Sequence, residues 1–184
     1  MCKLKTFMKM KNLIIGVLVL TILSLGCLNQ KVEIEFETIE KGLLCSYGTE
    51  VIAKEERYEE YSSFWAVVVI DEDGIEFNWR QVTTPSTPHP TVDFEKYIMI
   101  IVFQGLKKTG GYSIEIKDIY QIEDEVYIDV EIIEPGEGEG VTQAFSSPVH
   151  AVLIDKSQFM PGTLKFIFRN QNGDILQEIT KDIS

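Results

Sequence analysis

The chain has 184 residues, 45% of them hydrophobic, and its 29 acids outnumber its 17 lysines and arginines, which gives a formal charge of −12. A surface this acidic repels phosphate backbones, so the composition argues against nucleic acid as a ligand. The sequence contains no nucleophile-elbow pattern, phosphate-binding loop or cluster of Cys and His with metal-ligand spacing. We therefore expect a protein that is not an enzyme and that binds no cofactor or metal.

Residues 1–26 have the composition of an export signal. They carry four lysines and no acid, and the lysines precede an apolar stretch over residues 13–25. A cationic start followed by an apolar run of this length is typical of a secretory signal and is too short for a confident membrane span. We expect residues 1–26 to be removed, which changes the formal charge to −16 and places the mature chain outside the cytoplasm.

The pair Gly26-Cys27 stands where a lipoprotein signal peptidase would cleave. The usual motif has an aliphatic residue three places before the cysteine, and here that place holds Ser24. We expect Cys27 to be lipidated and to anchor the protein to the cell membrane, with simple cleavage or an uncleaved anchor as alternatives. In that case Cys45 has no partner for a disulfide within the mature chain.

Residues 27–90 are predicted to form the first part of the same domain. Alternating apolar and acidic residues over 29–40 indicate a strand, and residues 50–54 a second, short one. A stripe of aromatic and apolar residues at helical spacing predicts one helix near residues 55–67.

Apolar runs on both sides of residues 71–74, Asp-Glu-Asp-Gly, indicate a β-hairpin. Three prolines over residues 83–90 indicate an extended connection, and His89 within it is expected to be exposed.

Residues 91–184 are predicted to form a β domain, because apolar and polar residues alternate in several short segments. Short connections without a crossover helix predict antiparallel neighbours. The pair Asn172-Gly173 indicates a type I′ hairpin turn. The expected fold is mostly β, of the α+β class, an antiparallel sheet or sandwich with one helix packed against it. Its strands are expected at residues 97–104, 112–119, 126–133, 149–154, 163–169 and 174–180.

Three segments within residues 91–156 resemble the C-terminal domain of the PrcB family: Thr91-Val92-Asp93-Phe94, Thr109-Gly110-Gly111-Tyr112 and Val141-Thr142-Gln143-Ala144-Phe145-Ser146-Ser147-Pro148. That family is named after a lipoprotein subunit of a surface protease complex. The resemblance implies an accessory subunit that binds an exported protease or another envelope protein. It implies a domain family and no reaction.

If consecutive strands alternate in direction, the connections 105–111, 134–148 and 170–173 lie at one end of the sheet. Glycine-rich loops held at one end of a rigid β-scaffold are a common binding arrangement. Lys107 and Lys108 are adjacent cations in an acidic chain, so they are expected to be exposed and to attract an acidic patch on a partner. The candidate partner-binding residues are Lys107, Lys108, Thr109, Gly110, Gly111, Tyr112, Gly136, Gly138, Gly140, Thr142 and Gln143.

A second interpretation is a protease inhibitor. Residues 109–112, together with the glycine loop 136–140, are similar to two of the three binding loops of chagasin-type cysteine-protease inhibitors, which are immunoglobulin-like sandwiches. The chain departs from that family in having Lys107-Lys108 before the threonine and in lacking an Arg-Pro-Trp loop. A serine nucleophile with a histidine base is not expected, because Ser147 and His150 are three apart in a predicted strand and so point to opposite faces.

Overall fold

The computed structural model describes residues 30–43, 62–82 and 89–183, and the part from Lys31 onward falls in one compact unit. The elements, in chain order, are β1 (Val32–Glu33), β2 (Glu37–Leu43), β3 (Trp65–Val69), α4 (Glu72–Val82), β4 (Tyr97–Phe103), β5 (Ser113–Ile122), β6 (Glu125–Ile133), β7 (Pro148–Asp155), the 3-10 helix η2 (Lys156–Gln158), β8 (Gly162–Asn170) and β9 (Ile175–Ile183).

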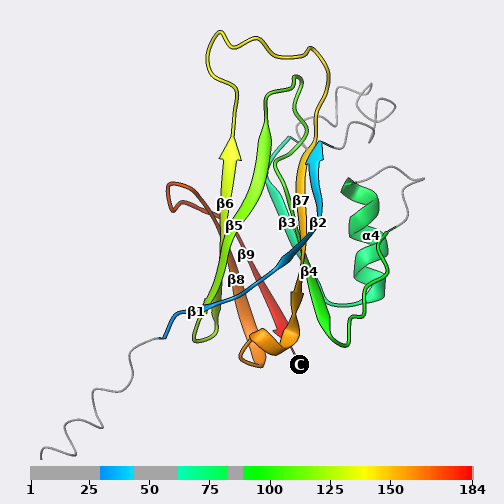
Figure 1. Cartoon of the computed structure of the whole chain (residues 1–184), viewed down its shortest axis with the longest axis vertical. Helices are drawn as coiled ribbons and strands as arrows, with labels where there is room; N and C mark the ends of the chain where they lie inside the picture. The colour runs from blue at the N-terminus through cyan, green and yellow to red at the C-terminus, as the bar shows by residue number, and fades with distance from the viewer. Residues whose placement is uncertain (1–29, 44–61, 83–88, 184) are drawn as a thin grey trace, which may run out of the picture. The chain divides into compact units, whose positions relative to one another are not determined.

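The strands form two sheets that pack face to face as a sandwich. Sheet A has the order β1-β5-β6-β8-β9, and sheet B has the order β2-β7-β4-β3. Figure 1 shows the two layers, with α4 beside sheet B. The predicted mostly-β fold with one helix is therefore confirmed over the described residues. The six strands expected after residue 91 are all present, with ends that lie within three residues of the prediction.

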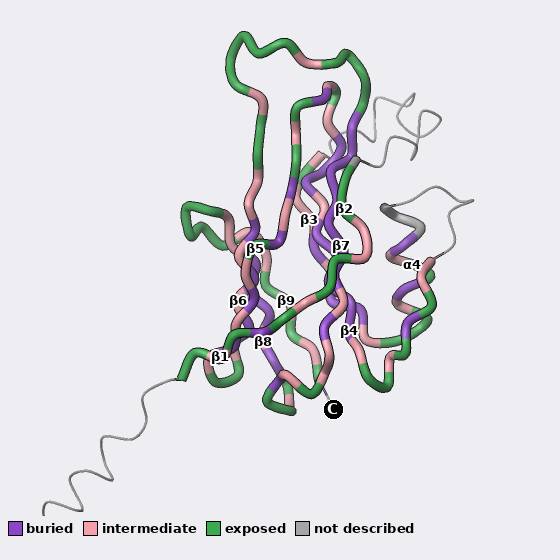
Figure 2. The backbone as a smooth tube through the Cα atoms, viewed as in Figure 1, coloured by how far each residue is buried: buried purple, intermediate pink, exposed green. Residues whose placement is uncertain are grey.

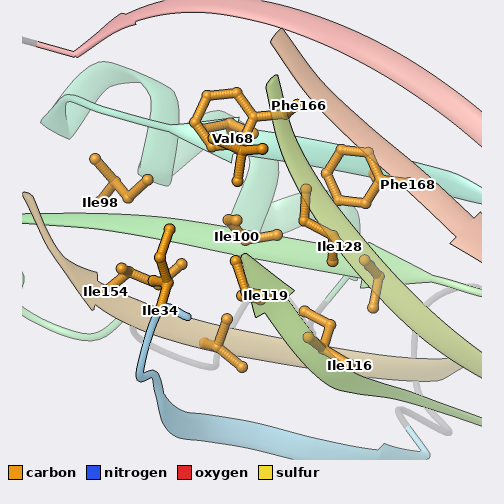
Figure 3. Packing of buried hydrophobic residues seen from close by; sticks show 14 of the residues in the cluster. Ile34, Val68, Ile98, Ile100, Ile116, Ile119, Ile128, Ile154, Phe166 and Phe168 are labelled. Atoms are coloured by element: carbon orange, nitrogen blue, oxygen red, sulfur yellow. The ribbon is translucent and has the colours of Figure 1, made fainter. Parts of the chain in front are cut away.

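The main core lies between the two sheets, where the inward-facing side chains of both meet. Ile100 of β4 is fully buried, as are Ile128 of β6 and Phe166 and Phe168 of β8. Figure 3 shows these side chains converging from different strands. Burying each such side chain contributes roughly 1.5–3 kcal/mol, so this layer is the main source of stability.

A second core lies on the other face of sheet B, under α4. Ile75 and Trp79 of α4 pack against Met99 and Ile101 of β4. Both faces of β4 are therefore covered, which explains why its five central residues are all apolar and buried. Figure 2 shows this burial along the strands beside α4.

Residues 71–74 begin a helix, and the prediction of a hairpin there was wrong. The Asp71 side chain accepts a hydrogen bond from the Gly74 N–H at 2.6 Å, and the Asp71 carbonyl accepts one from Ile75. An aspartate in this position satisfies N–H groups that lack a partner in the first turn of the helix. Ile75 and Trp79 are four residues apart, so both face sheet B, a spacing that fits a helix and not a strand.

The helix predicted near residues 55–67 is not found in its described part. Residues 55–61 lie outside the described residues, as does the short strand predicted over 50–54. Residues 65–67 belong to β3, which pairs with β4 in the register Trp65↔Phe103. The run from Trp65 to Val69 is apolar throughout, and it forms a strand because β4 offers a pairing edge and a packed surface on each face.

Residues 29–40 were predicted to be one strand, and the described part forms two. β1 pairs with β5 in sheet A, whereas β2 pairs with β7 in sheet B. Between them the chain crosses from one sheet to the other, with Ile34 and Phe36 packed against the main core. The alternation of apolar and acidic residues is unbroken through this crossing, so the sequence pattern does not show where one strand ends and the next begins.

The prediction that all neighbours are antiparallel was also wrong at one place, because β6 and β8 pair in parallel. After β6 the chain crosses to sheet B to form β7, and η2 then returns it to sheet A for β8. An excursion through the opposite sheet brings the chain back in its original direction, as a crossover helix does in other parallel pairs.

The turn between β8 and β9 is not of type I′. That type needs positive φ at both central residues, and among the described non-glycine residues only Glu123 has positive φ. Here the Gly173 N–H bonds to the Asn170 carbonyl at 2.9 Å, and Gly173 itself has a φ of 85°. The arrangement is a three-residue hairpin loop closed by a glycine in the left-handed region.

Candidate protein-binding site at the loop end

Three connections lie at one end of the sandwich, which we call the loop end: residues 104–112, 134–147 and 170–174. The register of the strands fixes them there, since Ser113 at the start of β5 pairs with Ile133 at the end of β6. In Figure 1 the connection from β4 to β5 and the connection from β6 to β7 rise together above the sheets. The predicted placement of these connections is therefore found, although one strand pair is parallel.

The first two connections are tied to each other through their backbones. Lys107 and Ser146 form an antiparallel bridge, with N–H to carbonyl distances of 2.8 and 2.9 Å. The Gly110 N–H donates to the Thr142 carbonyl at 2.9 Å, and the Ser146 hydroxyl donates to the Thr109 carbonyl at 2.7 Å. These bonds hold the two connections as one unit, so a partner would meet a preformed surface.

Gly110 lies inside this unit with its N–H bonded to Thr142, whereas Gly111 beside it is exposed. Gly110 is buried, and a Cβ atom placed on it would come within 2.3 Å of the Thr142 hydroxyl oxygen. A Cβ on Gly111 would meet Val141 at 2.8 Å and Pro135 at 3.0 Å. Both glycines thus allow the two connections to approach closely.

The tip of the second connection is exposed. Residues 136–140 form a small turn in which the Glu139 carboxylate accepts a hydrogen bond from the Gly136 N–H at 2.8 Å. Neither Gly138 nor Gly140 has an atom within 4 Å of a Cβ placed on it. Thr142 and Gln143 are also exposed, and Figure 2 shows the exposed residues that follow this connection.

The two adjacent lysines have different surroundings. Lys108 is exposed as predicted, but Lys107 is only half exposed. The Lys107 ammonium lies 3.4 Å from the Ser62 carbonyl and 5.4 Å from the centre of the Tyr112 ring. Lys107 therefore takes part in holding the loop end together, and Lys108 is the better probe of the surface charge.

His150 is buried within the sandwich and links both sheets. Its Nδ1 atom accepts a hydrogen bond from the Ile116 N–H of β5 at 2.8 Å, and its Nε2 atom lies 2.9 Å from the Thr38 hydroxyl of β2. Burial, with a smaller effect of the Lys41 charge, lowers the pKa of His150 to about 4. Both ring nitrogens are therefore engaged in contacts within the sandwich. The Ser146 hydroxyl, four residues earlier in the chain, donates to the Thr109 carbonyl.

The hairpin turn from β8 to β9 reaches the end of β6 through one side chain. The Gln171 amide accepts from the Ile132 N–H at 3.1 Å and donates to the Ile132 carbonyl at 2.9 Å. Gln104, which is buried at the end of β4, donates to the Ile133 carbonyl at 3.1 Å. Sequence reasoning missed Ser146, Gln171 and Gln104, because isolated serine and glutamine residues carry no motif.

Residues 98–155 match the family model described as PrcB C-terminal. The match confirms the resemblance seen in the sequence, and it covers the span from β4 to β7 with both tied connections. No curated protein and no solved structure matches the chain.

Cys27, the predicted lipidation site, lies outside the described residues. Within the described ranges no helix is both long and apolar enough to cross a membrane.

Proposed function

We propose that this protein is a lipoprotein that is anchored outside the cytoplasm and that acts without catalysis, as an accessory subunit for an exported protease or another envelope protein. The observation that carries the proposal is the construction of the loop end. Two long connections are joined by backbone hydrogen bonds at Lys107–Ser146 and Gly110–Thr142, and they present an exposed tip at residues 136–140 and 142–145. A preformed surface loses little conformational entropy when it binds.

The match over residues 98–155 supports the same proposal, because it includes both tied connections and leaves out β8 and β9. The segment that resembles the family thus contains the two tied connections of the loop end, and the turn from β8 to β9 lies outside it. The anchor at Cys27 is supported by the sequence of residues 1–27 alone.

The test is site-specific photo-crosslinking of the full chain in its native envelope. A photoreactive residue at Gln143 in the exposed tip is compared with one at Asp124, which is exposed in the turn at the opposite end of β5 and β6. We expect a defined protein to be captured from position 143 and not from position 124. Equal capture from both positions, or none from position 143, would contradict docking at the loop end.

Anchoring is tested separately, by mass spectrometry of the protein extracted from membranes. A diacylglycerol on an N-terminal Cys27 is the expected result, and an unmodified Cys27 in a chain recovered without detergent would refute the anchor.

Protease inhibition is the second candidate. The observation that favours it is the sandwich itself, because loops at one end of a β-sandwich are the arrangement used by chagasin-type inhibitors. However, the Gly110 N–H and the Thr109 carbonyl are engaged within the molecule. Titration against papain-like and subtilisin-like proteases distinguishes the two functions, since an inhibitor blocks activity at stoichiometric amounts and a docking subunit does not.

A further inference from the structure

The upper part of β6 extends beyond its neighbour in sheet A. β8 pairs with β6 only as far as Val130↔Asn170, and the chain then turns away into the β8–β9 hairpin. Figure 1 shows this hairpin leaving β6 below the long connection at the loop end. Among the described residues, no strand pairs with the β8 side of β6 over residues 131–134.

The Gln171 side chain occupies the position that another strand would take. Its amide bonds to both the N–H and the carbonyl of Ile132, as the backbone of a paired strand does. Backbone groups that point to the same side recur every second residue in a strand, so the edge presents Ile132 and then Glu134.

Two other glutamines make the same two-bond contact, and their positions differ from that of Gln171. Gln177 of β9 bonds both backbone groups of Ala66 in β3, and Gln158 of η2 bonds both backbone groups of Glu35. Both are half buried and close the two open sides of the sandwich. Gln171 is exposed and lies on a turn that Asn170 holds by its own hydrogen bonds, so it can leave without disturbing the fold.

The space beside this edge is an open groove of about 530 Å³, lined by Ile132, Ile133, Glu134, Asn170 and Gln171. The Ile133 residue is 48% exposed beside this groove. Ile175, opposite Arg169 at the start of β9, is 59% exposed. An apolar side chain of a bound segment would therefore find apolar contacts next to the free edge.

The charge of this region selects the partner. Glu134, Glu137 and Glu139 follow one another in the connection after β6, while Glu131 within β6 is paired with Lys117 at 3.5 Å. No lysine or arginine occurs in the sequence between Lys117 and Lys156. A segment that carries lysine or arginine is attracted to such a surface, and an acidic one is repelled.

We propose that residues 131–133 of β6 and the adjoining Glu134 accept an extended segment with alternating apolar and basic side chains as an added strand, which displaces the Gln171 amide. The inference rests on the proposed docking function and names the surface and the chemistry of the partner. Main-chain hydrogen bonds to the β6 edge provide affinity, while the acidic residues and Ile133 provide selectivity.

The test uses hydrogen–deuterium exchange of the full chain in detergent with a synthetic seven-residue peptide of alternating valine and lysine. The control peptide alternates valine and glutamate. We expect the lysine peptide to protect the amides of Ile132 and Glu134, which point to the free edge, and the glutamate peptide to leave them unchanged. Protection at a different strand, or equal protection by both peptides, would overturn the proposal.

Three variants sharpen the result. Gln171→Ala removes the competing side chain and should tighten binding of the lysine peptide about twofold, the factor that corresponds to a displaced contact at an exposed edge worth about 0.5 kcal/mol. Glu134→Pro removes an N–H from the edge and should abolish protection, whereas Glu134→Gln keeps that N–H and should retain a weaker protection. An unchanged affinity in Gln171→Ala would refute the displacement.

The two proposals can fail separately. If crosslinking from Gln143 still captures the same protein in the Glu134→Pro variant, docking at the loop end stands and the β6 edge is not its site. If the lysine peptide protects the edge but position 143 captures no protein, the edge is a peptide-binding site and the accessory-subunit function falls.

Discussion

Gly105 lies where the chain leaves β4 and enters the loop end, and it is held by contact with another part of the backbone. It is buried, its φ is 94°, and a Cβ atom placed on it would lie 2.2 Å from the Ser62 carbonyl oxygen. A backbone atom cannot rotate away as a side chain can. The position therefore requires glycine both for its φ and for the space.

We expect Gly105→Ala to lower the free energy of unfolding by more than about 3 kcal/mol, because positive φ and a backbone collision act together. Gly173→Ala is the matched control, since Gly173 has a φ of 85° and no atom within 4 Å of a Cβ placed on it. In the control, Gly173→Ala, the free energy of unfolding should fall by only about 1 kcal/mol. Urea unfolding of both variants measures the difference, and equal losses would show that the Ser62 contact does not limit the site.

His150 should make the stability of the protein depend on pH. Its pKa is about 4 in the folded chain and 6.5 in the unfolded chain. Well above pH 6.5 His150 is neutral in both the folded and the unfolded chain, so its burial costs no stability. As the pH falls from 6.5 to 4 only the unfolded state binds the proton, and stability falls by up to roughly 3 kcal/mol in all.

The measurement is urea unfolding of wild type and His150→Gln at pH 7, 5.5 and 4.5. Glutamine offers a donor and an acceptor but does not titrate, so the variant should be less stable at pH 7 and should lose less on acidification. The pKa of Glu115 is lowered by Lys41 and Lys117, but its contribution is lost only near and below its ordinary value of 4.5. If the free energy of unfolding of the two proteins changes equally with pH above pH 5, His150 does not control stability in this range.

At the scale of the elements, two glutamines close the sides of the sandwich. Gln177 bonds the N–H and the carbonyl of Ala66, which is 2% exposed, at 2.9 and 3.0 Å. We expect Gln177→Ala to cost about 1–3 kcal/mol, because it leaves two buried backbone groups without a partner.

The matched comparison is Gln171→Ala, in which the released groups of Ile132 lie at an exposed edge and can bond to water. Its cost should be about 0.5 kcal/mol or less. Thermal unfolding of the two variants provides the test. A loss in Gln171→Ala as large as that in Gln177→Ala would mean that the β6 edge is part of the folded framework.

The strands after residue 91 could be predicted because their inward and outward residues alternate, as Val126, Ile128 and Val130 do against Tyr127 and Asp129. The helix could not be located by the same means. The aromatic stripe that predicts a helix near residues 55–67 ends within β3. The Asp-Glu-Asp-Gly sequence that caps α4 has the composition of a hairpin turn, so its pattern predicts the wrong element. Pairing between distant strands also left no local pattern, so the parallel neighbours β6 and β8 were not foreseen.

For the candidate site, strand direction was enough to predict that the connections gather at one end. It could not predict which groups would be free. Gly110 and Lys107 were expected to be available to a partner, and the structure places Gly110 in a buried contact and Lys107 over Tyr112. The contacts that decide this are made to residues 142–146 and to Ser62, far away in sequence.

For the whole molecule, strand register and the short tether predict which end of the described domain would lie near the proposed anchor. β1 pairs with β5 as Val32↔Gln121, at the end of β5 that is remote from the loop end. If Cys27 carries the lipid, residues 28–31 span at most about 14 Å, so the membrane would lie near the turn at Glu123 and Asp124. The eight residue steps of β6 then carry the chain about 26 Å towards the loop end, which would point away from the bilayer.

This orientation can be measured with a fluorescent label and nitroxide-bearing lipids that quench it at short range. In a Cys45→Ser background, a label at Asp124→Cys on the lipidated protein should be quenched more strongly than one at Gln143→Cys. Chains with Cys27→Ser provide the control, since neither label should then be quenched. Equal or reversed quenching on the lipidated protein would place the loop end against the membrane, where an exported partner could not approach it from outside.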